Sequence, residues 1–411
     1  MDGGRSWNGQ TVPAAKFPGI FVADPVTAVG TSGEVYVASM FGNHAIPNNP
    51  FGFQLSRLDG GYTNKALYYL LAPLLPLWRL TADNSNREGG MAVARTAGVG
   101  HTFMPPVIIG GTDMSGDPGD KPWLITDNNP ASAYRGSIYA SWAGFFGKKI
   151  KSLETISSGL LFVYSRDGGT TFSSPEYITH HGFGVQLVVR PNGILDALYL
   201  SEDFKAVLHQ QSSNGGVSFT PETVVAPKEA DTLRSLPTLA VSPEGALLAC
   251  WSEKRKSIHV VCETSEDGLR WSHMTDVVPN PPEGGVIAYP AAAATGAVWW
   301  VLVYIADADA TRVVLYRSID RGASFSPYAT LATRRFGAPS FCAVFVYEGS
   351  CRYNAFVRDF LPGDYVGLAA SGHRLAMAFA LPRNDDPVGF TNVYAQVLDL
   401  PGESGASSTG H

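Results

Sequence analysis

The sequence predicts an all-β protein, a six-bladed β-propeller in which each blade is a four-stranded antiparallel sheet. Three observations lead to this prediction. A short motif close to Ser-x-Asp-Gly-Gly-x-x-aromatic recurs along the chain, short β-type segments precede each clear copy, and the 411 residues include 44 Gly and 28 Pro. Recurrence of one local pattern is typical of repeat architectures, in which each repeat is one supersecondary unit. Abundant Gly and Pro suit many short strands joined by tight turns.

The recurring motif is expected to form a tight turn between two strands. An Asp in such a turn accepts hydrogen bonds from nearby backbone N–H groups, and the glycines supply positive φ angles. The aromatic residue then starts the next strand and packs between sheets. We therefore expect a structural role, without catalysis, for the Asp or Asn of the six copies, which are Asp2, Asp59, Asp167, Asn214, Asp267 and Asp320.

Segments rich in β-branched, aromatic and other apolar residues precede the motifs and continue to the end of the chain. They give two or three strands for each blade. The segments are residues 26–29 and 34–39; 123–126, 137–142 and 160–164; 186–189, 197–200 and 206–208; 239–241, 247–251 and 258–262; 291–294, 298–304 and 313–316; and 366–369, 375–379 and 392–397.

The two ends of the chain are expected to share the last blade. The turn at residues 2–7 has no strand before it, and residues 8–13 can supply the fourth strand of the C-terminal blade. Such a strand closes the ring and removes exposed sheet edges. Seven blades are the alternative, because the interval between Asp59 and Asp167 is about twice as long as the others and has room for another blade. We predict a single domain over residues 1–411, with insertions at about residues 64–119 and 333–363.

Composition excludes some classes of function. The net charge of −6 is spread along the chain and gives no basic surface for nucleic acid and no polybasic patch for a membrane. No apolar run is long enough to span a bilayer. The four cysteines form two local pairs, Cys250 with Cys262 and Cys342 with Cys351. These pairs favour disulfides and a secreted or extracytoplasmic protein, although no secretory leader is visible, and buried free thiols are the alternative.

The motif resembles the Asp-box (BNR) repeat, which is found in sialidases and in other propellers. The resemblance implies that the Asp boxes lie on one face, and that any active site lies at the opposite mouth of the channel. That mouth is built from the starts of the innermost strands and from the loops between the second and third strands. Polar residues occur at most of these starts, and the substrate is expected to be a carbohydrate or glycoconjugate.

A sialidase-like glycoside hydrolase is the function that the resemblance favours. It implies a tyrosine nucleophile with a neighbouring carboxylate, an aspartate as acid/base, and arginines for the substrate carboxylate. Residues 234–237 look like the Phe-Arg-Ile-Pro motif of the family, but in the fourth blade, while the first blade has Asp24. The predicted catalytic residues are Tyr365, Asp364 and Asp24, and the predicted substrate-binding residues are Arg234, Lys121, Tyr289, His181, Arg352 and Arg358.

Three alternatives remain open from the sequence. A polysaccharide lyase would use His180, His181 or Tyr289 as base, with Lys121 or Arg234 against the substrate carboxylate. A different glycosidase would use two carboxylates, such as Asp24 and Asp364. A non-catalytic propeller would bind a glycan or a protein.

No cofactor is predicted apart from a calcium site at the acidic loop of Asp113, Asp117 and Asp120, whose spacing is not that of an EF-hand. A solvated cluster of turn residues is the alternative reading of this loop.

Overall fold

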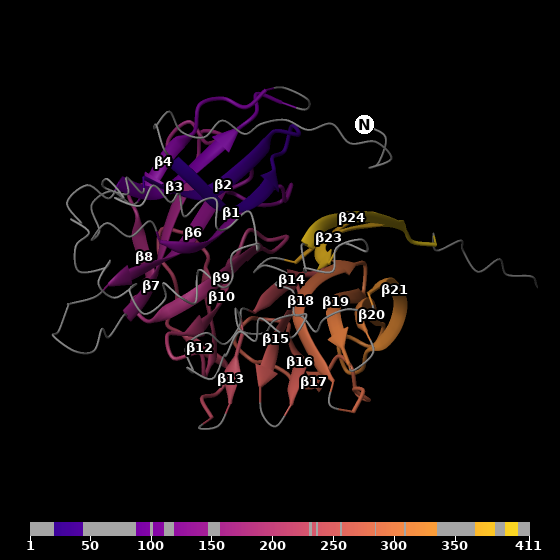
Figure 1. Cartoon of the computed structure of the whole chain (residues 1–411). Coiled ribbons are helices and arrows are strands. Elements are labelled where there is room, and N and C mark those ends of the chain that lie inside the picture. The colour runs from indigo at the N-terminus through magenta and orange to yellow at the C-terminus, as the bar shows by residue number, and fades with distance from the viewer. Residues whose placement is uncertain are drawn as a thin grey trace, which may run out of the picture. The chain divides into compact units, whose positions relative to one another are not determined.

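The computed structural model describes residues 20–43, 88–98, 102–110, 119–146, 157–229, 232–235, 237–254, 257–283, 285–307, 310–334, 366–382 and 391–401. All regular elements in these ranges are β-strands, and none is an α-helix (Figure 1). No helix that could cross a membrane is found in this part of the chain. The strands belong to two compact units, an N-terminal unit of residues 10–128 and 134–185 and a C-terminal unit that contains the rest of the chain.

The N-terminal unit contains two four-stranded antiparallel sheets. The first has the order β1 (Ile20–Val29), β2 (Val35–Asn43), β3 (Glu88–Arg95) and β4 (Val107–Gly110). The second has the order β5 (Asp120–Thr126), β6 (Ile138–Phe146), β7 (Ser157–Ser165) and β8 (Glu176–Thr179). Both follow the expected meander, in which each strand pairs with the next strand in the sequence.

The C-terminal unit continues the same pattern. The first of its sheets contains β9 (Gly182–Val189), β10 (Leu195–Ser201), β11 (Val207–Ser212) and β12 (Thr223–Ala226). The second contains β13 (Leu233–Arg234), β14 (Thr238–Val241), β15 (Leu247–Lys254), β16 (Ile258–Ser265) and β17 (Thr275–Asp276), and the third contains β18 (Val286–Thr295), β19 (Val298–Ala306), β20 (Thr311–Ser318) and β21 (Ser326–Arg334). A single parallel pair, Ile258 with Val286, connects the second and third into one nine-stranded hydrogen-bonded sheet. The last contains β22 (Gly367–Ser371), β23 (Arg374–Pro382) and β24 (Thr391–Asp399). The first few residues of β9 belong to the N-terminal unit. In the second of these sheets β13 and β14 both pair with β15, so together they form its innermost strand.

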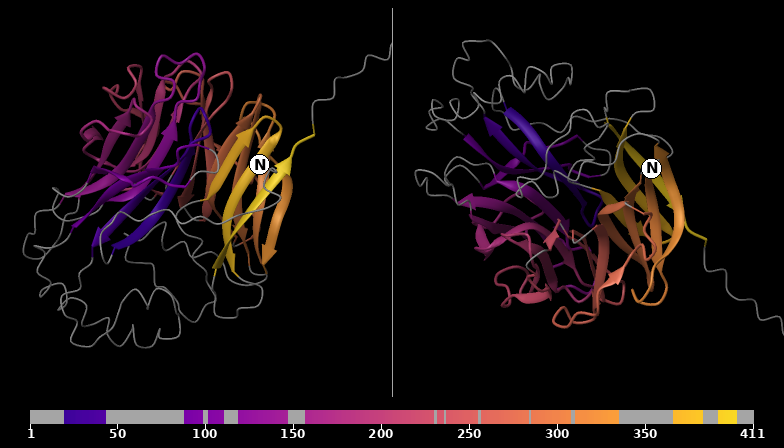
Figure 2. Two further views of the ribbon diagram at one scale, coloured as in Figure 1. Left: turned by 90° about the horizontal axis from the view of Figure 1, so that it is seen from above. Right: turned by 60° about the horizontal axis from the view of Figure 1, so that its bottom comes forward.

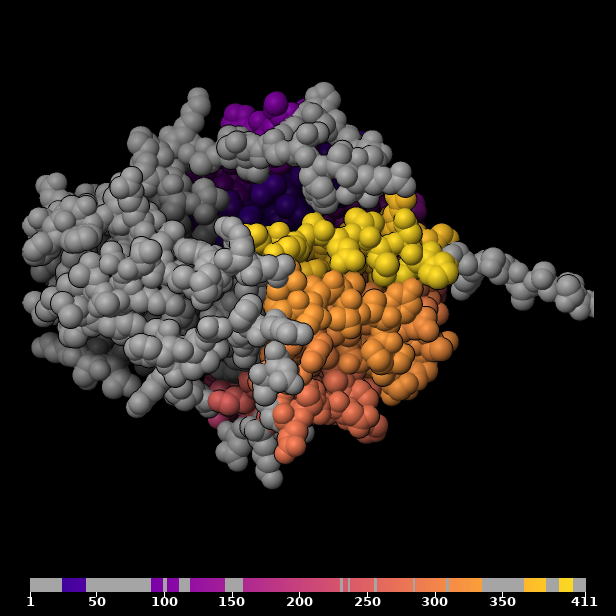
Figure 3. All heavy atoms as spheres, turned by 45° about the vertical axis from the view of Figure 1, so that its right-hand side comes forward, coloured from indigo at the N-terminus to yellow at the C-terminus, as the bar shows by residue number. Residues whose placement is uncertain are grey.

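Apolar side chains between neighbouring sheets form the core of the C-terminal unit. One cluster joins β14–β17 to β18–β21 through residues such as Leu248, Val301 and Val303, which are fully buried. Another joins β18–β21 to β22–β24 through Leu315, Leu375 and other residues. Figures 2 and 3 show the second contact, where the yellow strands β22–β24 lie against the orange strands β18–β21.

The first sheet differs from the sequence-based assignment. Its third and fourth strands, β3 and β4, lie within residues 64–119, which were expected to form an insertion. Their connecting turn runs from Thr96 to Phe103, with the same spacing as Ser165 to Phe172, but Gly98 occupies the place of the Asp. The loss of that Asp explains why the sequence pattern did not reveal this turn. Between residues 59 and 167 the described strands belong to the first two sheets.

The described motif turns have the hydrogen bonds that the sequence predicts. Asp167 Oδ1 accepts from the backbone N–H groups of Thr170 and Thr171 at 3.0 and 2.9 Å, and Ser165 Oγ accepts from the N–H of Gly169. Asn214, Asp267 and Asp320 make equivalent bonds in their own turns. The side-chain and backbone bonds from Thr171 lower the pKa of Asp167 to about 2. Asp2, Asp59 and the predicted closing strand at residues 8–13 lie outside the described residues.

The first cysteine pair is a disulfide. Cys250 and Cys262 face each other across β15 and β16, with an S–S distance of 2.02 Å. Both side chains are buried in the cluster between β14–β17 and β18–β21. This contact confirms the expected hairpin, while Cys342 and Cys351 lie outside the described residues.

The disulfide is expected to stabilise the protein by restricting the unfolded chain. It links residues 12 apart in the sequence, and closing a loop of this size corresponds to about 3 kcal/mol. The double variant Cys250→Val/Cys262→Val keeps apolar side chains at both positions. We expect urea denaturation to show a loss of 2–3 kcal/mol, roughly, for this variant. An unchanged denaturation midpoint would show that the cross-link does not stabilise the fold.

Candidate functional site

Each antiparallel sheet has two chemically different ends. In the sheets that contain Asp167, Asn214, Asp267 and Asp320 a motif turn joins the third strand to the fourth, and antiparallel pairing places the start of the innermost strand at the opposite end. We call these the turn end and the entry end. The loops between the second and third strands also lie at the entry end. Among the described residues, the candidates Asp24, Lys121 and Tyr289 therefore belong to the entry ends of their own sheets.

Three innermost strands have the same unusual backbone feature within their first five residues. Asp24, Lys121 and Tyr289 have φ angles of 52°, 52° and 56°, and each precedes a proline. Each lies where the register with the second strand shifts by one residue, so each forms a β-bulge. Left-handed backbone at a residue with a side chain costs about 1–3 kcal/mol and occurs preferentially at functional sites. β-bulges likewise re-aim side chains near active sites.

In the N-terminal unit two of these bulges bring charged groups together. Lys121 Nζ lies 3.7 Å from Asp24 Oδ2 and 3.4 Å from Asp120 Oδ1. The side chains of Asp24 and Asp120 are 24% and 28% exposed, and that of Lys121 is 12% exposed. The N–H of Lys121 also donates to Asp120 Oδ1 at 2.8 Å. We call Asp24, Asp120 and Lys121 the entry cluster, and its carboxylates are open to solvent.

The entry cluster has the composition needed for acid/base chemistry. One carboxylate oxygen of each aspartate lies within 4 Å of the same nitrogen, so these two oxygens are at most about 7 Å apart. Carboxyl pairs in glycoside hydrolases are about 5–9.5 Å apart. The lysine between them can donate hydrogen bonds to a hydroxyl or carboxylate group. Asp24 and Lys121 were both predicted from the sequence, whereas Asp120 was assigned there to a calcium site.

In the C-terminal unit Tyr289 lies at the start of β18 but turns toward the core. Its N–H donates to Ser252 Oγ at 3.1 Å, and its ring meets Tyr304 edge-on with centroids 5.9 Å apart. Only 7% of the residue is exposed. The structure therefore places Tyr289 at the entry end with most of its surface covered by the cluster between β18–β21 and β22–β24.

Arg234 is a buried structural arginine. Its Nε donates to Glu253 Oε2 at 2.9 Å, and its Nη1 donates to the carbonyl oxygens of Lys205 and Pro227. The residue has no exposed surface. These partners tie β13 to the neighbouring sheet, and they leave the guanidinium poorly placed for the substrate carboxylate that the sequence assigned to it.

A second carboxylate lies close to this ion pair. Glu263 on β16 is 6% exposed, and burial raises its pKa to about 7, with a further increase from the charge of Glu253. The positive charge of Arg234 acts in the opposite direction and lowers this pKa. Glu263 therefore titrates close to neutral pH, and sequence spacing alone did not distinguish it from other strand glutamates.

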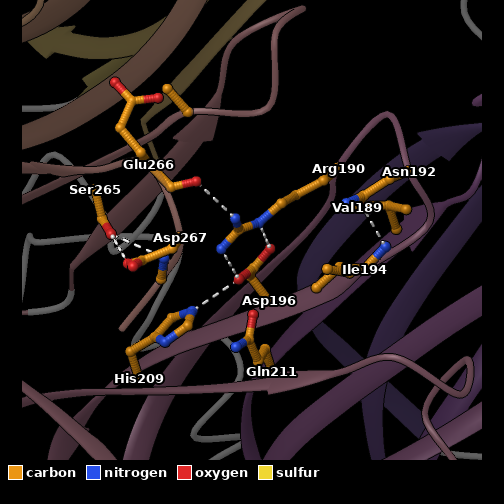
Figure 4. A network of polar contacts seen from close by, with 12 residues as sticks. Val189, Arg190, Asn192, Ile194, Asp196, His209, Gln211, Ser265, Glu266 and Asp267 are labelled. Atoms are coloured by element: carbon orange, nitrogen blue, oxygen red, sulfur yellow. Dashed lines mark hydrogen bonds and ion pairs between the residues drawn. The ribbon is translucent and has the colours of Figure 1, made fainter. Parts of the chain in front are cut away.

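A buried polar network lies beneath a motif turn at the other end of the C-terminal sheets (Figure 4). Arg190 binds Asp196 through two bonds of 2.7 Å, and His209 Nε2 lies 2.9 Å from Asp196 Oδ1. Arg190 Nη1 also donates to the carbonyl oxygen of Glu266 at 3.2 Å. Asp196 and His209 are completely buried, so this network connects β9–β12 to the next motif turn and has no access to a substrate.

The remaining predicted site residues divide into two groups. His181 is exposed at the start of β9, and its N–H donates to Thr179 Oγ1 at 3.3 Å. Tyr365, Asp364, Arg352 and Arg358 lie outside the described residues, as do Asp113 and Asp117 of the predicted calcium site. No group of three His, Cys, Asp or Glu side chains with metal-binding geometry occurs within the described ranges.

Comparison with solved structures identifies the fold. The chain is similar to a protein of unknown function from Dyadobacter fermentans, with a TM-score of 0.56 and 12% identity over 94% of this chain and 97% of that one. It is also similar to an α-L-arabinofuranosidase from Fusarium graminearum, with a TM-score of 0.51 and 13% identity over 94% and 96% of the chains. A sialidase from Streptococcus pneumoniae gives a TM-score of 0.51 and 8% identity over 95% and 70%. The protein thus has a sialidase-like propeller fold.

Comparisons by sequence find no counterpart. No protein-family model matches the chain, and no curated protein matches it.

The raised pKa of Glu263 predicts a pH dependence of stability. Its folded-state pKa is about 7 against an ordinary value of 4.5, so the folded protein binds more protons than the unfolded chain between these values. The contribution of Glu263 is therefore fully favourable below about pH 4.5 and is lost as the pH rises through 7. We expect Glu263→Gln to remove this decline in urea denaturation series. A decline of the same size in the variant would assign it to other groups.

The turn at Gly268 packs on the buried Arg190–Asp196 ion pair, which predicts that an added side chain there lowers stability. A Cβ atom at Gly268 would lie 2.4 Å from Arg190 Nη2, whereas one at Gly296 would meet nothing within 4 Å. Both glycines have positive φ angles, 76° and 54°. Gly296→Ala is expected to lose about 1 kcal/mol through backbone strain alone. Gly268→Ala is expected to lose at least about 2 kcal/mol more, because the buried ion pair must shift. Equal losses in thermal denaturation would contradict the packing role.

Proposed function

We propose that the protein is a carbohydrate-active propeller, a glycoside hydrolase that acts at the entry end of its sheets. The observation that carries this proposal is the entry cluster, in which Asp24 and Asp120 flank Lys121 on two strained bulges. One carboxyl group protonates the oxygen of the departing sugar, and the other attacks the anomeric carbon or activates water. The arabinofuranosidase and the sialidase that share this fold support a glycan as the substrate.

The bonding of Arg234 favours a neutral glycoside over a sialoside. A sialoside carries a carboxylate, which arginine binds best through two parallel hydrogen bonds. Arg234 is fully buried and directs its Nε toward Glu253. The predicted roles of Tyr365 and Asp364 as nucleophile and partner, and of Arg352 and Arg358 as ligands of a substrate carboxylate, remain part of the proposal for the sialidase-like alternative.

We also propose that the protein functions in a secreted or extracytoplasmic setting. The support for this location is the disulfide between Cys250 and Cys262, because disulfides persist mainly in oxidising compartments.

Substitution of the two carboxylates tests the proposed function. The wild-type protein is assayed with nitrophenyl glycosides, including an α-L-arabinofuranoside, and with a fluorogenic sialoside. We expect Asp24→Asn and Asp120→Asn each to lower kcat by at least about 100-fold, because each removes a group that transfers a proton or attacks the sugar. Azide is expected to restore turnover in one of the two variants, since it replaces a missing carboxylate nucleophile or base.

Glu176→Gln is the matched control, because Glu176 is an exposed carboxylate at the turn end of the same unit. It should keep the wild-type rate. Wild-type rates in both aspartate variants would overturn the assignment of the entry cluster. Glycan binding without cleavage of any glycoside would favour the non-catalytic alternative.

A further inference from the structure

A serine, a histidine and an aspartate form a series of side-chain contacts at the entry end of the sheet formed by β13–β17. Ser257 Oγ lies 2.5 Å from His259 Nε2, and His259 Nδ1 lies 3.6 Å from Asp276 Oδ1. The serine contacts one ring nitrogen and the aspartate faces the other. This is the order of contacts in which a serine is activated by a base whose orientation a carboxylate supports.

Strand register explains why these residues meet. His259 and Val261 lie on one face of β16, because side chains alternate along a strand. Asp276 on β17 pairs with Val261, so it lies diagonally from His259 and within reach of its ring. Ser257 directly precedes β16 in the loop that follows β15. The disulfide between Cys250 and Cys262 fixes the register of β15 against β16, and Cys262 also pairs with Thr275 beside Asp276.

Accessibility separates this group from the other histidine–aspartate contact in the same unit. His209 and Asp196 are completely buried and bind Arg190, so no substrate reaches them. His259 is 28% exposed, Asp276 is 51% exposed, and Ser257 is exposed. The serine oxygen is therefore open to an acyl group from solvent while it remains in contact with its base.

We propose that Ser257, His259 and Asp276 form a nucleophilic site that hydrolyses short-chain carboxylic esters. Ser257 Oγ attacks the ester carbonyl carbon and gives its proton to His259 Nε2. The bond from that carbon to the alcohol oxygen breaks, the departing oxygen takes the proton from His259, and an acyl-serine remains. Water then attacks the acyl-serine, its proton passes through His259 to Ser257 Oγ, and the carboxylic acid leaves.

The geometry predicts that His259 contributes more to the rate than Asp276 does. His259 contacts the nucleophile directly, and a positioned general base contributes about 100-fold or more to the rate. Asp276 is half-exposed and lies at 3.6 Å, which is an ion-pair distance longer than a hydrogen bond. An exposed pair of this kind changes a rate by no more than about fivefold. Asp276 is thus a positioning residue for the imidazole.

Covalent labelling of the full chain tests the site. The probes are nitrophenyl acetate, which acylates an activated serine and releases a coloured product, and a fluorophosphonate, which labels such a serine permanently. We expect a burst of about one nitrophenolate per chain and a fluorophosphonate adduct on Ser257 in peptide mass spectra. Ser257→Ala should lose both, and His259→Gln should slow labelling by at least about 100-fold. Asp276→Asn should slow it by no more than about fivefold.

Two variants serve as matched controls. Ser174→Ala removes another exposed serine, and His180→Gln removes an exposed histidine that contacts Tyr177. Both should keep the wild-type burst and label. A wild-type chain without a burst, or a label that persists in Ser257→Ala, would overturn the proposal. A burst that is lost in His180→Gln would assign the reaction to a surface imidazole and would equally overturn it. Glycoside cleavage is expected to be unchanged in Ser257→Ala, so this result is independent of the proposed function.

Discussion

The structure depends on turns in which one side-chain oxygen binds several backbone N–H groups. At Asp167 and Asp267 a single carboxylate oxygen accepts two such bonds, and a serine two residues earlier accepts another. The glycines of each turn then allow close approach to the preceding sheet. Gly169 packs near Tyr36, Gly268 packs on Arg190 and His209, and Gly322 packs on Thr264. The turns therefore connect neighbouring sheets as well as neighbouring strands. At the turn ends, the turn glycines pack against side chains of the preceding sheet.

Three innermost strands carry a strained residue near the opposite ends of the sheets. Asp24, Lys121 and Tyr289 have left-handed backbone conformations before proline. Glycine at any of these positions would adopt the same conformation without strain, but the side chain would be lost. In the N-terminal unit the strained residues present charges to solvent, and in the C-terminal unit Tyr289 points inward. The same backbone conformation thus places partly exposed charged groups in one unit and a buried aromatic ring in the other.

Much of the fold could be predicted from the sequence because repeated turns and apolar alternation are local signals. The Cys250–Cys262 hairpin and the strands around Asp167, Asn214, Asp267 and Asp320 were predicted for this reason. β3 and β4 were not, because Gly98 replaces the motif Asp and a long segment separates them from β2. Within the candidate site Asp24 and Lys121 were predicted because they lie at the expected starts of innermost strands, where the resemblance to Asp-box propellers places a site. The burial of Arg234, the raised pKa of Glu263 and the meeting of Ser257 with Asp276 depend on sheet register and on neighbouring sheets, which the sequence does not display.

The disulfide also determines how this hairpin responds to proteolysis. Cys250 lies before the loop between β15 and β16, and Cys262 lies after it. The sequence between the two strands contains Arg255 and Lys256, which are cleavage positions for a trypsin-like protease. A chain that is cut there remains one covalent molecule, because the disulfide joins a residue before the cut to a residue after it. Its two halves separate only after reduction, so a nicked and an intact protein have the same mass in oxidising conditions, apart from one water.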